Sequence, residues 1–336
     1  MRDTTFEGGT RPGPPRPGVK WSTVMYSLRW TKIRRKICPC PVGAGPFITL
    51  EATMSTVRIE SIKPHIGGIV HVTKEHLLDD ETAAAVREAL EDRGVLVFPR
   101  LNLTGAEQLA FTDKLGKRLN YNKKAPGSGA SGEEDVYAIT LDKEINNQPE
   151  YVLGTFFWHI DGVTINQPLP KATLLSARKL APAGGQTEFA STYAAYANLP
   201  DEEKKALDKL RVVHKMEASM RPVFEHLSEE DVARWRGMSE VMVHPLVWAH
   251  NSGRKSLVVG SHADSVVDMP IAHGRSLLVR LQEWAAQPAF SYRHEWQAGD
   301  LAIWDNCGCM HRVVPYDENC GRMMDRTSIM GEERVA

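Results

Sequence analysis

Short apolar segments joined by turns recur along this chain, and they constrain its fold more than any other feature. They are short for helices, many are rich in β-branched or aromatic residues, and turn-forming residues flank several of them, which is typical of strands. The segments that we predict to be strands are 57–62, 67–72, 95–99, 240–248, 255–260, 290–296, 300–306 and 325–331. The segments that we predict to be helices are 79–94, 104–116, a pair within 191–211, and 276–287. Many short strands with a few outer helices predict an α+β fold with a β-sandwich or jelly-roll core.

Residues 1–53 differ in composition from the rest of the chain. They are rich in proline and carry nine Lys or Arg against three Asp or Glu, a local excess of six positive charges. We expect a disordered basic extension here, or residues that precede a natural start at Met54; a nucleic-acid-binding arm and a transit peptide are the alternatives. We expect residues 54–336 to form a single domain, which is long enough to bury a substantial core.

Composition argues against several classes of partner. A formal net charge of −1 over 336 residues gives no electrostatic basis for binding nucleic acid. The chain has no run of about 18 apolar residues that could span a membrane, and no secretory signal. Five cysteines, an odd count spread over distant segments, argue against a disulfide framework, and their C-x-C spacing is narrower than structural zinc sites use. We therefore expect a cytoplasmic protein without a nucleic-acid or membrane partner, and we leave homo-oligomerisation open.

The segment "FFWHIDGV" places His159 and Asp161 one residue apart. If this segment is a strand, both side chains leave the same face and can reach one metal ion. His311, in "GDLAIWDNCGCMHRVV", is the third candidate ligand. Two histidines and one carboxylate on one face of Fe(II) leave three adjacent positions open, which can take a bidentate 2-oxo acid and dioxygen. A short His-x-Asp pair arises often by chance, so the prediction depends on further residues.

Those further residues are a hydroxyl and two guanidinium groups. Thr187 follows two glycines in "GGQTEFA", and Arg322 and Arg326 lie in "GRMMDRTSIMG". A fixed guanidinium with one extra donor suits the distal carboxylate of 2-oxoglutarate. If the arginine segment is a strand, both arginines project from one face. Surface salt bridges are the alternative role for the two arginines.

Together these segments resemble the taurine dioxygenase / dichlorophenoxyacetate dioxygenase family of Fe(II)/2-oxoglutarate enzymes. The resemblance runs from about Val57 to Glu333, and it is carried by "WHIDG", "LAPAGGQTEFASTYAAYANLP", "HPLVWAHNSGRKSLVVGSHADSV", "WQAGDLAIWDN" and "MHRVVPYDENCGRMMDRTSIMGE". It implies a double-stranded β-helix, that is, a jelly-roll barrel, with helices packed outside. It also implies that iron is held by His159, Asp161 and His311.

The resemblance extends to the co-substrate and the primary substrate. Thr187 and Arg322 match the family positions that bind the far carboxylate of 2-oxoglutarate. Arg326 matches a position that often holds an anionic group of the primary substrate, and His262, in "GSHAD", matches a family histidine with either a substrate-binding or a structural role. The stretch 261–300 is closer to the phenoxyalkanoate-degrading branch than to the taurine branch. Taurine-type enzymes carry a sulfonate-binding histidine where this chain has "RLNYNKK", and Cys307 follows "WDN" where members usually have arginine.

The expected reaction converts 2-oxoglutarate and dioxygen to succinate and CO2 while it hydroxylates a small anionic organic substrate. An aryloxyalkanoate-like acid is the favoured substrate, and an alkyl sulfonate or sulfate ester is the alternative. A zinc-dependent hydrolase could use the same three ligands, because zinc often takes three protein ligands plus water. A jelly-roll binding protein with a vestigial triad is the non-enzymatic alternative.

Overall fold

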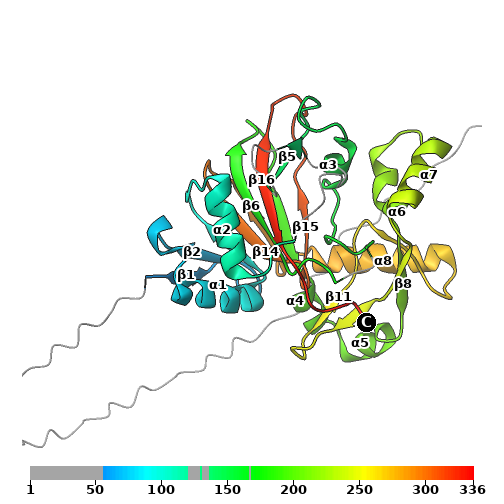
Figure 1. Ribbon diagram of the computed structural model, residues 1–336. Helices are drawn as coiled ribbons and strands as arrows, with labels where there is room; N and C mark the ends of the chain where they lie inside the picture. The colour runs from blue at the N-terminus through cyan, green and yellow to red at the C-terminus, as the bar shows by residue number, and fades with distance from the viewer. Residues whose placement is uncertain (1–55, 120–128, 131–135, 166–167) are drawn as a thin grey trace, which may run out of the picture. The chain divides into compact units, whose positions relative to one another are not determined.

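The computed structural model describes residues 56–119, 129–130, 136–165 and 168–336 (Figure 1). The predicted disordered extension, residues 1–53, lies outside these ranges. Within them helices and sheets are mixed, which confirms the α+β content of the prediction. None of the helices in the described part of the chain combines the length and the apolar character needed to cross a lipid bilayer.

The helices and strands follow each other in an irregular order along the chain. The helices are η1 (Lys74–His76), α1 (Asp80–Arg93), α2 (Gly105–Leu115), α3 (Glu150–Gly154), α4 (Thr192–Ala197), α5 (Asp201–Leu207), α6 (Met216–Met220), η2 (Arg221–Val223), α7 (Glu229–Met238) and α8 (Ile271–Ala285). The strands are β1 (Arg58–Ser61), β2 (Gly68–His71), β3 (Val95–Phe98), β4 (Gly129–Ala130), β5 (Tyr137–Thr140), β6 (Ala172–Lys179), β7 (Thr187–Ser191), β8 (Arg211–His214), β9 (Met242–Pro245), β10 (Val247–Ala249), β11 (Lys255–Leu257), β12 (Ala263–Val266), β13 (Ser291–His294), β14 (Leu301–Asp305), β15 (Cys309–Val313) and β16 (Met323–Ile329).

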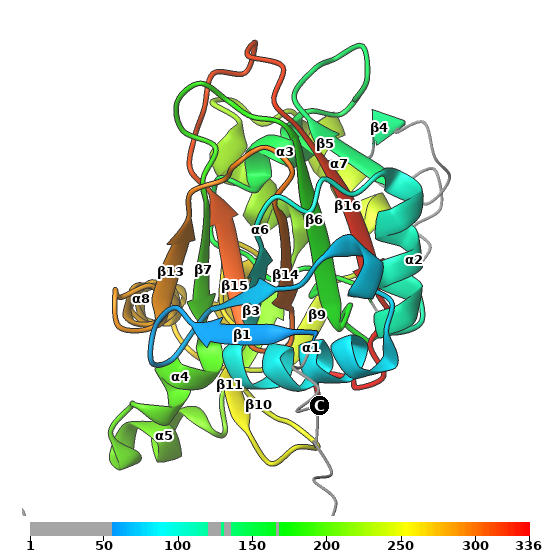
Figure 2. The same ribbon diagram turned by 90° about the vertical axis from the view of Figure 1, so that its left-hand side faces the viewer.

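The largest sheet has eight strands in the order β1-β2-β3-β14-β6-β16-β5-β4. Its neighbours are antiparallel except for β2 and β3, which are parallel. Helices α1 and α2 cover one face (Figure 2). Between them and the sheet lies a core that includes Leu90 and Phe111 from the helices and Leu96, Phe98 and Leu301 from the strands. The amphipathic helices predicted at 79–94 and 104–116 are therefore confirmed.

A three-stranded sheet, β13-β7-β15, lies on the other face of the large sheet. Its three strands run side by side in Figure 2. The core between the two sheets contains Val97, Leu175 and Trp304 from the large sheet and Phe189 and Cys309 from the small one. Successive residues of a strand point to opposite faces, so the central strands must be apolar on both faces, as their unbroken apolar sequences indicate.

Two smaller sheets, β12-β8-β9 and β10-β11, complete the β structure of the described residues. They share a core with α4 and α8 that includes Leu246, Trp248, Leu257 and Leu281. The segment 240–248, predicted as one strand, is divided between β9 and β10, which belong to different sheets. Leu246 lies between the two strands, and its amide donates to the carbonyl oxygen of Leu210.

Local signals fix several helix ends as the sequence indicates. The hydroxyl of Thr104 accepts from the amide of Glu107, and the Glu107 carboxylate accepts from the amide of Thr104, which is a complete capping box for α2. Gly94 ends α1 with a φ of 71°, a left-handed conformation that glycine adopts without steric cost.

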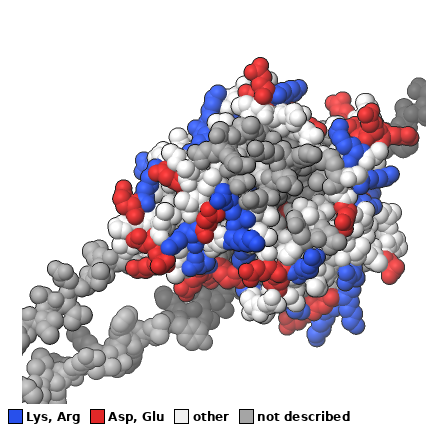
Figure 3. Space-filling model, viewed as in Figure 1, with Lys and Arg blue, Asp and Glu red and all other residues white. Residues whose placement is uncertain are grey.

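Lysine and arginine side chains are interspersed with aspartate and glutamate on the face drawn in Figure 3.

Candidate metal centre

His159 and His311 lie opposite each other on two antiparallel segments. The amide of His159 donates to the carbonyl oxygen of His311 at 3.0 Å, and the amide of His311 donates to the carbonyl oxygen of His159 at 2.9 Å. Strand β15, which carries His311, also pairs with β7, where Phe189 is its partner. These backbone contacts bring the two imidazole rings to 4.1 Å between centroids.

The predicted strand around His159 is wrong in extent. The chain makes one isolated bridge at His159 and enters a turn at Asp161. Gly162 has a φ of 83°, and a Cβ added there would lie 2.6 Å from Cδ of Pro170. Asp161 therefore reaches the histidines through a tight glycine-dependent turn and not through the alternation of a pleated strand.

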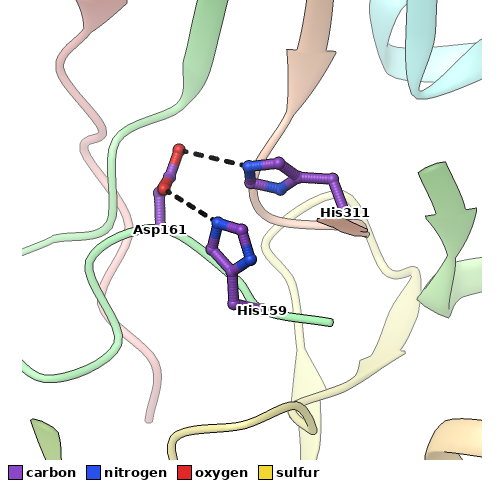
Figure 4. A group of neighbouring side chains, drawn as sticks. All are labelled: His159, Asp161 and His311. Carbon is purple, nitrogen blue, oxygen red and sulfur yellow. Dashed lines mark ion pairs between the residues drawn. The ribbon is translucent and has the colours of Figure 1, made fainter. Parts of the chain in front are cut away.

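The three predicted ligands converge despite this difference (Figure 4). Nε2 of His159 lies 3.9 Å from Oδ1 of Asp161, and Nε2 of His311 lies 3.9 Å from Oδ2. One ligand atom from each residue lies within 4.8 Å of the others, and all three residues are buried. Among the described residues, this is the one group of histidine, cysteine and acidic side chains with the spacing of a metal site.

The protonation of the two histidines suits metal binding. Nδ1 of His159 lies 2.8 Å from the carbonyl oxygen of Phe157, which only accepts, so Nδ1 carries the hydrogen and Nε2 keeps its lone pair. Burial lowers the pKa of both imidazoles, most strongly that of His311. Neutral imidazole is the form that ligates a metal ion.

The carboxylate of Asp161 is held by two donors at the same oxygen. The Thr173 hydroxyl and Nη2 of Arg326 each donate to Oδ2, both at 2.9 Å. Burial alone would raise the pKa of Asp161, but the charge of Arg326, followed by the hydrogen bond from the Thr173 hydroxyl, holds that pKa below its usual range. The candidate ligand set is thus a carboxylate and two neutral imidazoles, which is the chemistry that Fe(II) takes in oxygenases.

The predicted 2-oxoglutarate residues lie on neighbouring parts of the same structure. Arg322 is buried just before β16, and its Nη2 donates to the carbonyl oxygen of Gly185 at 3.1 Å, two residues before Thr187. Nε of Arg322 is buried without a hydrogen-bond acceptor among the described residues, which leaves a donor for an anion. The Thr187 hydroxyl accepts from Nε1 of Trp296 at 3.0 Å. Thr187 pairs with Val313 of β15, so it lies on the strand next to His311.

His262 lies close to the candidate metal ligands. Its ring centroid is 6.5 Å from that of His159, and its Nδ1 is buried without a hydrogen-bond partner within residues 56–119, 129–130, 136–165 and 168–336. Burial, helped by the neighbouring His159, lowers the pKa of His262 to about 3. The preceding Gly260 packs directly on the metal-ligand segment, because an added Cβ would be 3.2 Å from Cα of His159.

Three buried polar residues near this site were not predicted from the sequence. Thr173 and Asn306 contact each other and, through Thr173, Asp161. His214 is fully buried, and neither of its ring nitrogens has a hydrogen-bond partner among the described residues. Thr173 lies in an apolar strand sequence, where a single hydroxyl gives no signal. Asn306 belongs to the "WDN" segment, which could have indicated it.

Comparison with known proteins shows the family to which this chain is similar. The family model described as "Taurine catabolism dioxygenase TauD, TfdA family" matches residues 58–328. An alpha-ketoglutarate-dependent 2,4-dichlorophenoxyacetate dioxygenase of Burkholderia sp. (strain RASC) is 32% identical over 286 residues, which cover 82% of this chain and 95% of that protein. An alkylsulfatase of Acinetobacter baylyi (strain ATCC 33305 / BD413 / ADP1) is 28% identical over 86% of this chain and 87% of its own.

A solved structure agrees with these sequence matches. The crystal structure of AAD-2 in complex with Mn(II) and N-oxalylglycine superimposes with a TM-score of 0.69 and 32% identity. The match covers 84% of this chain and all of AAD-2 (100%).

Proposed function

Because this chain belongs to the TauD, TfdA family of taurine catabolism dioxygenases, it is a 2-oxoglutarate-dependent dioxygenase, and we propose that it oxidises an aryloxyalkanoate-like acid. Fe(II), 2-oxoglutarate and dioxygen are its cofactor and co-substrates. The observation that carries the site assignment is the convergence of His159, Asp161 and His311 within 4.8 Å. We assign these three residues as the iron ligands.

The protein's own contribution at the metal is to position three ligand atoms. The backbone pairing of His159 with His311 sets the separation of the imidazoles, and the turn at Gly162 delivers the carboxylate of Asp161. When bound, Fe(II) supplies the activation of dioxygen that couples decarboxylation of 2-oxoglutarate to oxidation of a substrate C–H bond. One oxygen atom of dioxygen ends in succinate and the other in the hydroxylated substrate.

Arg322 and Thr187 are assigned to the far carboxylate of 2-oxoglutarate. The buried Nε of Arg322 has no acceptor in the described segments, and a carboxylate would supply one. The contact of Nη2 with the carbonyl oxygen of Gly185 holds the guanidinium in place beside the start of β7. Glycine suits this position, because φ of Gly185 is 77° and an added Cβ would lie 3.0 Å from Nε of Arg322.

Arg326 is assigned to the carboxylate of the primary substrate, with His262 as a second contact. The guanidinium of Arg326 reaches Oδ2 of Asp161, so an anion that it binds would lie beside the metal. Several relatives are named for phenoxy acids, which supports an aryloxyalkanoate. Hydroxylation of the carbon between the ether oxygen and the carboxylate gives a hemiacetal. Its C–O ether bond then breaks, the hydroxyl proton passes to the leaving oxygen, and a phenol and a 2-oxo acid are released.

The test combines the purified chain with Fe(II), ascorbate and 2-oxoglutarate, and offers a panel of aryloxyalkanoates, alkyl sulfates and alkyl sulfonates. We expect succinate and a phenol in equal amounts with an aryloxyalkanoate, and neither product without Fe(II) or with His311→Ala. A panel in which no aryloxyalkanoate stimulates succinate formation contradicts the substrate assignment. Turnover supported by Zn(II) without 2-oxoglutarate would instead favour the hydrolase.

A sulfate ester is the second candidate substrate, favoured by the similarity to the Acinetobacter baylyi alkylsulfatase. Hydroxylation of the carbon that bears the sulfate would release sulfate and leave an aldehyde. The same panel separates the two candidates, because only this reaction produces inorganic sulfate.

Several broader predictions remain proposals. We propose that the large sheet and the β13-β7-β15 sheet form the two sides of a double-stranded β-helix, which the packing of one sheet on the other supports. We also propose a single domain over residues 54–336, in agreement with the extent of the family match. A cytoplasmic location and a possible homo-oligomer remain predictions from the sequence.

A further inference from the structure

A buried hydrogen-bond chain leads from the large sheet to the carboxylate of Asp161. The Thr173 hydroxyl donates to Oδ2 of Asp161 at 2.9 Å, and Nδ2 of Asn306 lies 2.9 Å from the same hydroxyl oxygen. Thr173 and Asn306 are both completely buried. Neither residue reaches the triad as a ligand, so the chain acts on the metal centre only through Asp161.

The direction of each hydrogen bond follows from the chemistry of the groups. An ionised carboxylate only accepts, and a threonine hydroxyl has one hydrogen to donate. The Asn306 amide donates to the hydroxyl oxygen, so the hydroxyl hydrogen remains available for Asp161. Asn306 thereby fixes the rotation of the Thr173 hydroxyl toward the carboxylate.

The backbone holds both residues firmly. Thr173 pairs with Trp304 where β6 runs antiparallel to β14, and Asn306 directly follows β14. The amide of Asn306 donates to the carbonyl oxygen of Lys171 at 3.0 Å, which ties it to the start of β6. The hydrogen-bond chain is therefore anchored to the rigid centre of the large sheet, whereas Asp161 lies in a turn.

The hydrogen-bond chain through Thr173 also distinguishes the two carboxylate oxygens of Asp161. Thr173 and Arg326 both donate to Oδ2, whereas Oδ1 accepts from neither of them and would be available to a metal ion. The Arg326 side chain is 23% exposed and is assigned above to a substrate anion, whereas Thr173 is buried and its hydroxyl contacts Asp161 and Asn306. We propose that Thr173 and Asn306 are positioning residues that hold the Asp161 carboxylate in its metal-binding orientation, an inference that rests on the proposed iron site.

The test measures metal affinity directly, without turnover. The full-length protein, stripped of metal with EDTA and dialysed, is titrated with Co(II), and the visible absorption bands report the coordination geometry. For Thr173→Val, which keeps the shape of the side chain and removes the hydroxyl, we expect at least about tenfold weaker Co(II) binding and altered bands, as is typical when a partner of a metal ligand is lost. Thr173→Ser restores the hydroxyl and should bind within about threefold of the wild type.

Asn306 is tested through a double-mutant cycle. Asn306→Leu removes the amide donor at similar volume, and we expect a smaller loss of Co(II) affinity than for Thr173→Val. Added to Thr173→Val, it should cause no further loss, because Asn306 acts through the hydroxyl. The matched control is Thr82→Val in α1, a buried threonine whose hydroxyl has no hydrogen-bond partner in the described residues; it should bind Co(II) like the wild type.

Each outcome decides between the alternatives. Unchanged affinity in Thr173→Val, or equal loss in Thr173→Val and Thr173→Ser, overturns the positioning role. If circular dichroism shows that Thr173→Val does not fold, the Thr173→Ser and Asn306→Leu variants still decide. A tenfold loss of Co(II) affinity in Thr173→Ser overturns the proposal. A wild-type protein that binds no Co(II) refutes the metal site itself, which distinguishes failure of the proposed function from failure of this inference.

Discussion

Replacing Arg322 by glutamine tests how 2-oxoglutarate is held. Arg322 is 3% exposed, so water screens its charge little, and its Nε has no acceptor in the part of the chain that the structure describes. A hydrogen bond to a charged group contributes about 1.5–3 kcal/mol, and truncating one partner of a buried charge pair costs about 2–5 kcal/mol. A loss of about 3 kcal/mol of binding free energy raises the dissociation constant roughly 140-fold, because each 1.4 kcal/mol changes that constant tenfold.

The assay measures the dissociation constant of 2-oxoglutarate by calorimetry under anaerobic conditions with Mn(II) bound, alongside the KM for 2-oxoglutarate in turnover. We expect both to rise about 100-fold in Arg322→Gln, while kcat at saturating 2-oxoglutarate changes little. Arg322→Lys should lie between this variant and the wild type, since lysine keeps the charge but lacks the planar fork.

The matched control is Arg293→Gln. Arg293 pairs with Glu188 at 2.6 Å, but its side chain is 53% exposed, and exposed pairs contribute at most about 1 kcal/mol. We expect its 2-oxoglutarate affinity to stay within about twofold of the wild type. An unchanged dissociation constant in a folded, Mn(II)-binding Arg322→Gln protein would refute the assignment of Arg322.

Three further predictions concern the metal ligands, the turn and the stability of the sheet. His311→Ala should abolish measurable Co(II) binding while far-ultraviolet circular dichroism stays unchanged; retained binding would remove His311 from the site. Gly162→Ala should lower both the free energy of unfolding and the Co(II) affinity. Its control is Gly253→Ala: φ of Gly253 is 82°, but the added Cβ would meet no described atom within 4 Å. This control should cost only about 1 kcal/mol of unfolding free energy and leave Co(II) binding intact. Burial would raise the pKa of Asp300, but its hydrogen bonds, first that from His294, lower it below the usual 3.8. Its contribution to stability should therefore be complete above about pH 4 and be lost at lower pH. In urea unfolding, the wild type should have a higher free energy of unfolding than Asp300→Asn, and this difference should shrink below pH 4. A difference that does not depend on pH would contradict the argument.

The parts of this site that the sequence predicted are those whose residue types are chemically specialised. His159, Asp161 and His311 stand out because few other roles call for two histidines and a carboxylate in such segments, and the structure brings them together. The conformation around His159 was predicted wrongly, because an alternating pattern does not reveal that the chain turns at Gly162. Thr173 was missed because a hydroxyl in a buried strand is informative only once its cross-strand neighbours are known.

The register of the large sheet links the stability of the fold to the geometry of the candidate metal centre. In β6, Leu174 faces the core under α1 and α2, while Leu175 faces the core between the two sheets. Thr173 lies two residues before Leu175, so it shares the face that looks toward β15 and His311. A slip of β6 by one residue would exchange these faces, turn Thr173 toward α1 and α2, and place side chains of the wrong size and polarity in both cores. The apolar packing that stabilises the sheet therefore also determines that a hydroxyl, and not a leucine, meets Asp161.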